Sequence, residues 1–246
     1  MKFNPCAIVP VFRHENTVRD VVRGLVAQRL PVIVVDDGNS PEALQVLQRI
    51  SAEFPNVVTL SHHINMGKGG AVCTGLREAF RLGFTHALQI DADGQHDSSA
   101  VPLLLGASRK RPENLVGGFP VYDDSVPRER EIGRKITNFW VHLETLSSRI
   151  PDAMCGLRIY PLRKTVPVLD KVRTFRMGFD IEILVRLSWE RVGMDFYPVN
   201  VFYPRNGVSN FHVFRDNAEI SKLHARLFCG MILRLPKLLL GNRKHG

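Results

Sequence analysis

The sequence predicts an α/β protein built on a doubly wound, mostly parallel sheet. Short apolar runs suited to buried strands alternate with segments that carry apolar residues at helical spacing. Two of these runs end directly on pairs of aspartates. Ligands of open α/β sheets bind at the carboxyl ends of the strands, so the pattern that predicts the fold also predicts where a site lies.

The first half of the chain shows the alternation most clearly. Glu15 or Asn16 is a candidate N-cap for the first helix, and Ser40 followed by Pro41 predicts the start of the second. A glycine-rich loop, NMGKGGA, leads into the third helix. The expected strands are CAIVPVF (6–12), PVIVVDDG (31–38), NVVTL (56–60) and HALQIDAD (86–93).

The second half is less regular. LVGGF (115–119) and MDFYPVNVFYP (194–204) are expected strands, and GFDIEILVRLSWERVG is an expected helix ending at Gly193. A further helix is expected from about Glu131, and a basic helical tail from Asn217. We expect one domain over 1–215 and an amphipathic basic tail over 216–246. The apolar side of the helix from Glu131 would consist of Ile132, Ile136, Phe139, Trp140 and Leu143.

Composition narrows the class of protein. The 246 residues are 44% hydrophobic and 23% charged, which suits one sizeable globular domain. The four cysteines form no C-x-x-C pair, and the N-terminal segment is interpreted as a strand and not a signal peptide. No apolar run is long enough for a transmembrane helix. A cytoplasmic protein is expected, either free or peripheral on the inner face of the cytoplasmic membrane.

The net charge of +9 points to an anionic partner. A nucleotide diphosphate, a lipid phosphate and an anionic membrane surface all fit this charge. Nucleic acid is not expected, because the basic residues are not interleaved with aromatic residues in any recognisable module.

The segment LQIDADGQHD places Asp91 and Asp93 at a strand end, with Gln95 two residues further. Such hard oxygen ligands suit Mg²⁺ or Mn²⁺, which commonly binds one or two carboxylates plus substrate phosphates. The pattern alone also occurs in ordinary helix-capping loops. His62, His63 and His96 are expected to make polar contacts or face solvent and not to bind the metal.

Two further strand-end motifs allow a structural and a functional interpretation. Asp36-Asp37-Gly38 is either turn chemistry or a contact to a nucleobase or ribose. The NMGKGGA loop is either a helix start or a cradle in which Lys68 and backbone N–H groups bind a diphosphate. It matches neither the P-loop pattern nor the dinucleotide fingerprint.

Together these segments resemble a known family. AIVPVFRHENTV, VIVVDDGNS, NMGKGGAVCTGL, LQIDADGQHD and the later DAMCGLRIYPL resemble successive motifs of family 2 glycosyltransferases. The resemblance is to the branch of dolichyl-phosphate mannose synthases and bacterial polyprenyl-phosphate sugar synthases. It implies a GT-A fold with a Rossmann-like nucleotide-binding half, a nucleotide-diphosphate sugar donor and a lipid-linked or lipid-phosphate acceptor.

The resemblance also implies roles for individual residues. Pro10, Val11 and Glu15 would line the nucleotide pocket, and Asp37, with Asp36 beside it, would contact the base. Lys68 would lie near the diphosphate. Asp91, Asp93 and Gln95 would hold Mg²⁺ or Mn²⁺ on it. Arg134 would bind the acceptor phosphate, and Arg158 belongs to another family element.

The family generally inverts the anomeric centre, and a hydroxyl acceptor would then need a general base. Asp152, Asp180 and Glu182 are the candidates; as an alternative, Asp180 and Glu182 are ordinary acidic residues at a helix N-terminus. A lipid-phosphate acceptor is already anionic and needs little help from a base.

The chain departs from its branch because it lacks C-terminal transmembrane helices. Its tail is either a helix on a membrane surface or one that packs on the domain or a partner. YPRNGVSNF (203–211) resembles an acceptor-side segment, and an acyltransferase partner or a homo-oligomer is possible. Two alternative functions remain. One is a non-catalytic, membrane-associated nucleotide-sugar-binding module. The other is a phosphatase of the haloacid dehalogenase type, a class that also ends a strand in Asp-x-Asp.

Overall fold

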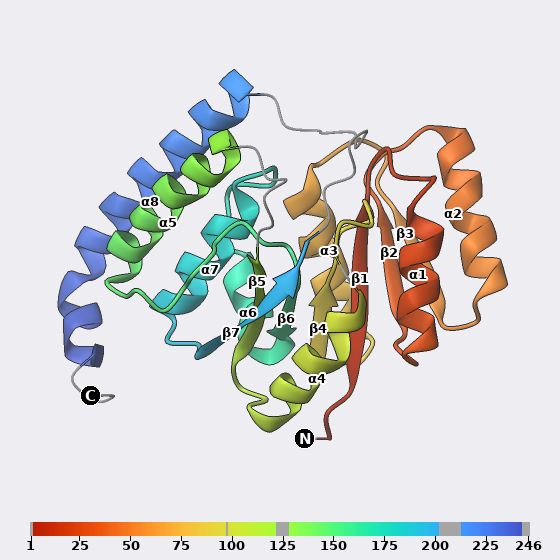
Figure 1. Cartoon of the computed structure of the whole chain (residues 1–246), viewed down its shortest axis with the longest axis horizontal. Coiled ribbons are helices and arrows are strands. Elements are labelled where there is room, and N and C mark those ends of the chain that lie inside the picture. The colour runs from red at the N-terminus through yellow and green to blue at the C-terminus, as the bar shows by residue number, and fades with distance from the viewer. Residues whose placement is uncertain (1, 97, 122–127, 202–212, 243–246) are drawn as a thin grey trace.

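The computed structural model describes residues 2–96, 98–121, 128–201 and 213–242. Seven strands form one sheet in the order β3-β2-β1-β4-β6-β5-β7 (Figure 1). All neighbours pair in parallel except β6, which runs antiparallel to both β4 and β5. The predicted mostly parallel α/β sheet is therefore confirmed. The strands are β1 (Pro5–Val11), β2 (Val32–Asp36), β3 (Val57–Ser61), β4 (His86–Gln89), β5 (Leu115–Val121), β6 (Arg158–Pro161) and β7 (Met194–Asn200).

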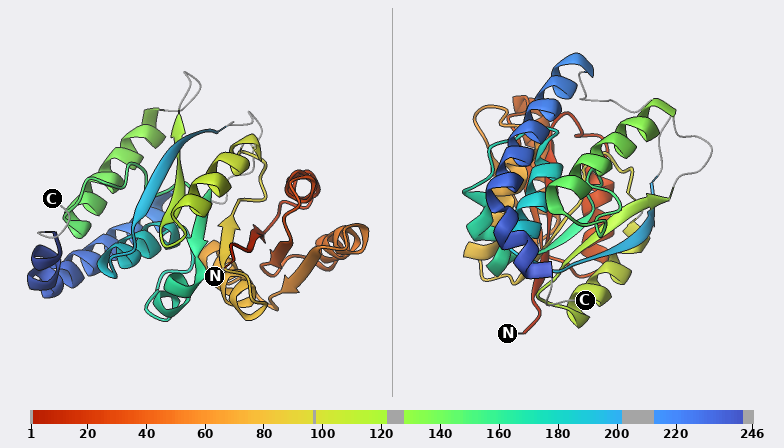
Figure 2. Two further views of the ribbon diagram at one scale, coloured as in Figure 1. Left: turned by 90° about the horizontal axis from the view of Figure 1, so that it is seen from below. Right: turned by 90° about the vertical axis from the view of Figure 1, so that its left-hand side faces the viewer.

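Helices cover both faces of the sheet (Figure 2). The strand–helix alternation through β5 follows the expected order, and Ser40 accepts a hydrogen bond from the backbone N–H of Ala43 at the start of α2, as its sequence predicts. The helices are α1 (Val18–Ala27), α2 (Pro41–Glu53), α3 (Lys68–Arg81), η1 (Ser98–Ala100), α4 (Val101–Lys110), α5 (Arg128–Thr145), α6 (Leu162–Leu169), α7 (Phe179–Trp189) and α8 (Val213–Asn242).

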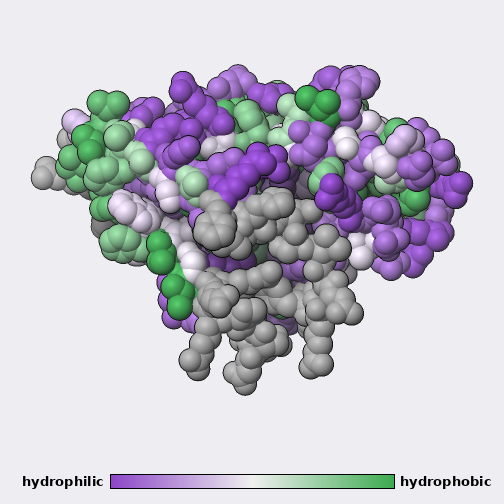
Figure 3. Space-filling view, turned by 90° about the horizontal axis from the view of Figure 1, so that it is seen from above, coloured by the Kyte–Doolittle hydropathy of each residue, from purple (hydrophilic) through white to green (hydrophobic). Residues whose placement is uncertain are grey.

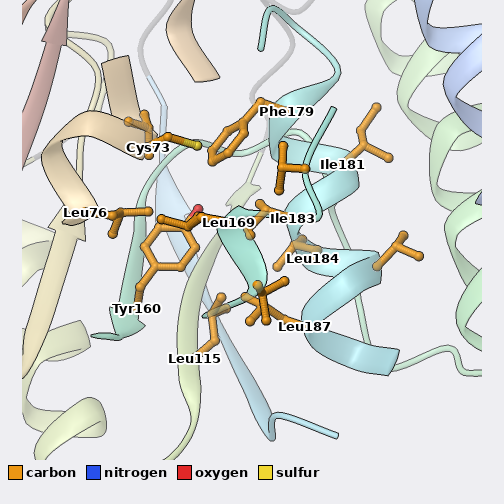
Figure 4. Packing of buried hydrophobic residues seen from close by; sticks show 14 of the residues in the cluster. Cys73, Leu76, Leu115, Tyr160, Leu169, Phe179, Ile181, Ile183, Leu184 and Leu187 are labelled. Atoms are coloured by element: carbon orange, nitrogen blue, oxygen red, sulfur yellow. The ribbon is translucent and has the colours of Figure 1, made fainter. Parts of the chain in front are cut away.

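The hydrophobic core has two layers, one on each face of the sheet. One layer joins β1, β2 and β4 to α1, α2 and α4. The other joins the sheet to α3, α6, α7 and α8. Figure 4 shows part of this second layer, where Leu76 of α3 and Tyr160 of β6 lie opposite Ile183 and Leu184 of α7. These layers fix the strand ends, and with them the site.

Helix α5 differs from its prediction. It begins at Arg128 and not near Glu131, and its expected apolar side faces outward: Ile132, Ile136 and Phe139 are 57%, 56% and 63% exposed. The buried side instead contains Val141 and Glu144, and Glu144 accepts a hydrogen bond from His224 of α8 at 2.8 Å. Periodicity identified the apolar stripe correctly, but it could not show that the side with the Glu144–His224 contact is the one that packs against the protein.

Helix α8 begins earlier than the predicted Asn217 and packs on the domain. It begins at Val213, so the expected boundary after residue 215 falls inside it. Leu223, Leu227 and Met231 enter the same core as α3 and α7. Figure 1 shows α8 running beside α5 at one edge of the molecule. No helix in the described ranges combines the length and apolarity needed to cross a membrane.

Candidate active site

Lys68 lies at the centre of a charged cluster at the carboxyl ends of the strands. It is the first residue of α3 and follows Gly67, whose φ of +88° suits glycine. Its Nζ lies 2.9 Å from Oδ2 of Asp180 on α7 and 2.8 Å from Oδ1 of Asp91. It also donates a hydrogen bond of 2.9 Å to Oδ2 of Asp91. One ammonium group is therefore shared by two carboxylates.

The segment after β4 turns tightly around its two aspartates. Gly94, with φ +73°, allows the turn, and Asp93 Oδ1 accepts the backbone N–H of Gln95 at 3.0 Å. His96 Nε2 lies 3.8 Å from Asp91 Oδ2, and its Nδ1 is buried with no hydrogen-bond partner among the described residues. Figure 3 views this end of the molecule, and hydrophilic residues lie across the upper middle of the view.

The electrostatics of this cluster follow from burial and opposing charges. Burial disfavours the charged form of Lys68, but Asp180 and Asp91 outweigh it and raise the pKa of the ammonium. Burial likewise opposes ionisation of Asp91, but Lys68 and His96 lower the pKa of that carboxyl. Burial and then the charge of Asp91 raise the pKa of Asp93. Asp93 thus lacks the compensating cation that Asp91 has.

These residues fit a divalent cation in their donor chemistry. Asp91 Oδ1 is buried and accepts no directed hydrogen bond within the described chain, although Lys68 lies close to it. No cluster of three or more His, Cys, Asp or Glu side chains suited to a metal exists in the described part of the chain. A cation here would therefore depend on two carboxylates and on substrate oxygens, the usual arrangement for Mg²⁺.

Gly156 closes the cluster from the side opposite α3. A Cβ at this position would lie 2.6 Å from Lys68 Nζ and 2.7 Å from Asp91 Oδ2. No side chain fits there without displacing the charged groups. Sequence reasoning noticed the CGLR segment but missed this glycine, because only the packing reveals what its Cβ would meet.

Asp36 ends β2, Asp37 follows it, and both are buried. Asp36 Oδ1 accepts the side-chain amide of Asn39 at 2.6 Å. Asp37 accepts the backbone N–H groups of Met66 at 2.9 Å and Gly67 at 2.8 Å, and it contacts His62 Nδ1 at 2.8 Å. Asp37 thereby joins the end of β2 to the loop that presents Lys68.

Asp180 rests on a buried polar network beneath Lys68. Its Oδ1 accepts a hydrogen bond from Gln89 Nε2 at 3.1 Å, and Gln89 Oε1 accepts one from the Tyr160 hydroxyl at 2.9 Å. Arg158 is fully buried and donates to the backbone oxygens of Asp180 and Ala153. The structure therefore gives Arg158 an internal position and adds Gln89 and Tyr160, which sequence reasoning missed.

Arg134 and Asp152 lie together at a second location. Arg134 Nη1 donates to Asp152 Oδ2 at 2.7 Å, and Asp152 Oδ1 accepts the backbone N–H groups of Met154 and Cys155. A pocket of about 190 Å³ opens here. It is lined by Phe119, Pro120, Glu131, Arg134, Lys135, Asn138, Pro151 and Asp152.

The remaining predicted residues lie in different surroundings. Glu182 is fully buried, and its partners are Arg186, Arg226 and two backbone N–H groups, none of which belongs to the Lys68 cluster. Pro10 and Val11 are buried at the end of β1, and Glu15 is half-buried just beyond it. YPRNGVSNF (203–211) lies outside the described residues.

The sheet order and the covering helices form the GT-A fold. Glucosyl-3-phosphoglycerate synthase from Mycobacterium tuberculosis, solved with Mn²⁺ and UDP-glucose, superposes with a TM-score of 0.69 at 14% identity, covering 94% of this chain and 79% of that one. The family model described as glycosyl transferase family 2 matches residues 6–177. The chain therefore belongs to glycosyltransferase family 2, and the phosphatase alternative is wrong.

Curated relatives place the resemblance in the expected branch. A protein of Methanococcus voltae named UDP-N-acetylglucosamine–dolichyl-phosphate N-acetylglucosaminyltransferase is 22% identical over 212 residues, covering 80% of this chain and 84% of its own. The undecaprenyl-phosphate mannosyltransferase of Micrococcus luteus is 35% identical over 161 residues, covering 64% of this chain and 65% of its own.

Proposed function

We propose that this glycosyltransferase moves a sugar from a nucleotide-diphosphate sugar to a lipid-phosphate acceptor, with a divalent cation and with inversion at the anomeric carbon. The observation that carries the proposal is the convergence of Lys68, Asp91 and Asp180 at the strand ends, with Asp93 beside them. The names of the two curated relatives, which both include a polyprenyl- or dolichyl-phosphate, support the choice of acceptor.

On the donor side, Asp91 and Asp93, assisted by Gln95, would hold Mg²⁺ or Mn²⁺. Such a cation would supply positive charge for the departing diphosphate. Lys68 supplies a second positive charge next to Asp91. The nucleoside would lie along the end of β1, at Pro10, Val11 and Glu15.

Asp36 and Asp37 shape this donor pocket through the loop they hold. The carboxylate of Asp37 is occupied by Met66, Gly67 and His62, so its main contribution is to fix the position of the Lys68 loop. Asn39 similarly engages Asp36. A nucleobase contact would require a nucleotide to take over one of these hydrogen bonds.

On the acceptor side, Arg134 and Lys135 line the pocket, where they pair with Asp152 and Glu131, so an anionic headgroup would take over these cations from the two carboxylates. A phosphate oxygen that attacks the sugar is already deprotonated, so this acceptor does not require a general base. Asp180 is the best placed of the three candidate bases for any acceptor that carries a hydroxyl, because it alone contacts Lys68. Glu182 has no such contact.

The outward face of α5 supports contact with an anionic membrane. Ile132, Ile136 and Phe139 are exposed along one side of this helix, and Phe139 contacts Trp140, which in turn contacts Phe228 of α8. We call these five residues the α5–α8 ridge. Figure 3 shows hydrophobic patches on the side of the molecule where α5 and α8 lie. Exposed Lys135 and the net charge of +9 favour an anionic lipid surface.

A transfer assay tests the proposed reaction. Radiolabelled sugars would be supplied as UDP-glucose, UDP-N-acetylglucosamine and GDP-mannose, with undecaprenyl phosphate and Mn²⁺. We expect lipid-extractable product from one donor, its loss with EDTA, and its loss in Asp93→Asn. Asp20→Asn, which removes only an exposed carboxylate paired with Arg23, is the matched control and should remain active. Activity that is unaffected by EDTA and by Asp93→Asn would contradict the metal site.

A vesicle assay tests the membrane contact separately. We expect the protein to sediment with vesicles containing anionic lipid, and Ile136→Ser with Phe139→Ser to weaken this binding. Leu103→Ser, which alters an exposed leucine on α4, is the control. Equal sedimentation of the ridge variant and the control would refute the contact, and a concentration-dependent dimer lost in the ridge variant would assign the ridge to a second copy.

A further inference from the structure

The polar network beneath Asp180 consists of side chains from two neighbouring strands. Gln89 ends β4 and lies opposite Arg158 in the antiparallel pairing with β6, on which Tyr160 also lies. None of these three side chains has any solvent exposure. The hydroxyl of Tyr160 donates to Gln89, and Gln89 donates to Asp180, so the hydrogen bonds run in one direction towards the charged cluster.

Burying these polar side chains lowers the stability of the fold, so their presence indicates that a specific geometry is needed here. Polar groups lose hydration when buried, and an apolar side chain of similar size packs in the same place at lower cost. Tyr160 lies in the hydrophobic core beside Leu76, with only its hydroxyl engaged in the network (Figure 4). Burial raises the pKa of that phenol, which keeps it protonated and able to donate.

The orientation of Asp180 decides where Lys68 lies. Gln89 donates to Oδ1 of Asp180, which also lies 3.5 Å from Nη1 of Arg158, and Oδ2 is directed at Lys68, 2.9 Å away. Lys68 Nζ also lies 2.8 and 2.9 Å from the two oxygens of Asp91, so without Asp180 its whole charge would fall on that carboxylate. A lysine paired with Asp91 alone competes with any cation that needs the same carboxylate.

We propose that Gln89 and Tyr160 are positioning residues, which orient Asp180 so that it shares Lys68 with Asp91 and leaves Asp91 able to bind the divalent cation. This inference rests on the proposed function, because it concerns the donor side of the same site. Neither residue touches the substrate; both act through Asp180.

Binding of UDP and of GDP, each with Mn²⁺, tests the inference by calorimetry without requiring catalysis. The variants are Gln89→Met, Tyr160→Phe, Asp180→Asn and the double variant of Gln89→Met with Asp180→Asn. Thr165→Val is the matched control, since Thr165 is buried and its hydroxyl has no hydrogen-bond partner among the described residues. Thermal unfolding of each variant establishes that it is folded, and Tyr160→Phe keeps the ring in the core if Gln89→Met does not fold.

We expect Gln89→Met to weaken binding about tenfold and Tyr160→Phe to weaken it less, within the range of coupling between contacting residues. The double variant should bind no more weakly than Asp180→Asn, because Gln89 acts only through Asp180. In catalysis, the KM for the donor should rise while the KM for the acceptor stays unchanged.

Two results would overturn the inference. One is wild-type affinity in both Gln89→Met and Tyr160→Phe. The other is a double variant in which the two separate losses multiply, which would show that Gln89 acts independently of Asp180. If the wild type binds neither UDP nor GDP, the proposed function itself is contradicted, and the inference with it.

Discussion

Replacement of Glu182 by glutamine should destabilise the protein strongly while leaving the chemistry of the folded fraction intact. Glu182 is fully buried, and its Oε1 accepts hydrogen bonds from Arg186 at 2.8 and 2.6 Å. Its Oε2 accepts the backbone N–H groups of Arg173 and Thr174 and the guanidinium of Arg226. An amide keeps the shape but removes the charge and turns one acceptor into a donor. Breaking a buried ion pair in this way costs about 3–5 kcal/mol.

Urea unfolding measures this loss, and the melting temperature of a protein of this size should fall by about 10 °C. Glu190→Gln is the control, because Glu190 is a largely exposed partner of Lys171 and its loss should cost less than about 1 kcal/mol. The kcat of the folded variant should stay close to that of the wild type. A Glu182→Gln protein with wild-type stability and no activity would refute this reasoning and restore Glu182 as a candidate base.

Three further predictions concern the site and the core. Gly156→Ala should lower kcat/KM by at least about 100-fold, because the Cβ of the new alanine would displace Lys68 and Asp91. Gly106→Ala, whose Cβ would meet nothing within 4 Å, is the control in the same kinetic assay. Asp37→Asn should reduce the free energy of unfolding in urea by about 2–3 kcal/mol, since the new amide group would face the N–H group of Gly67. An unchanged midpoint of the urea transition would contradict the role of Asp37 in holding the loop. A thiol reagent at neutral pH should label the native protein quickly only at Cys229, because burial raises the pKa of Cys6 and Cys73 to about 12 and of Cys155 to about 11. Rapid labelling of any of the three buried thiols would refute that.

The sequence was sufficient for the parts of the fold that depend on local pattern. Apolar runs located β1, β2 and β3, and the Ser40-Pro41 pair located the start of α2. The aspartates that follow β2 and β4 lie at the same end of the sheet, because parallel strands align their carboxyl ends. The antiparallel direction of β6 has no local signal and depends on long-range pairing.

The site required three-dimensional information for its partners. Sequence pattern identified Lys68 and Asp91, but the approach of Asp180 depends on how α7 packs against α3 and β4. Gln89 looked like one more strand residue, and Gly156 gave no sign of what its Cβ would meet. The apolar stripe of α5 was recognised, but its exposure was not, since periodicity identifies a face without showing what covers it.

The most direct test of the account is thermal stabilisation by UDP-, GDP- and dTDP-sugars, with and without Mn²⁺, in the wild type and in Asp93→Asn. A ligand that binds only the native state raises stability in proportion to RT ln(1 + [L]/Kd). We predict a Mn²⁺-dependent shift with one nucleotide in the wild type and its loss in Asp93→Asn, with Asp20→Asn unchanged. Stabilisation by the same donor that is equal with and without Mn²⁺, and equal in Asp93→Asn, would contradict the claim that these strand-end carboxylates form a metal-dependent donor site.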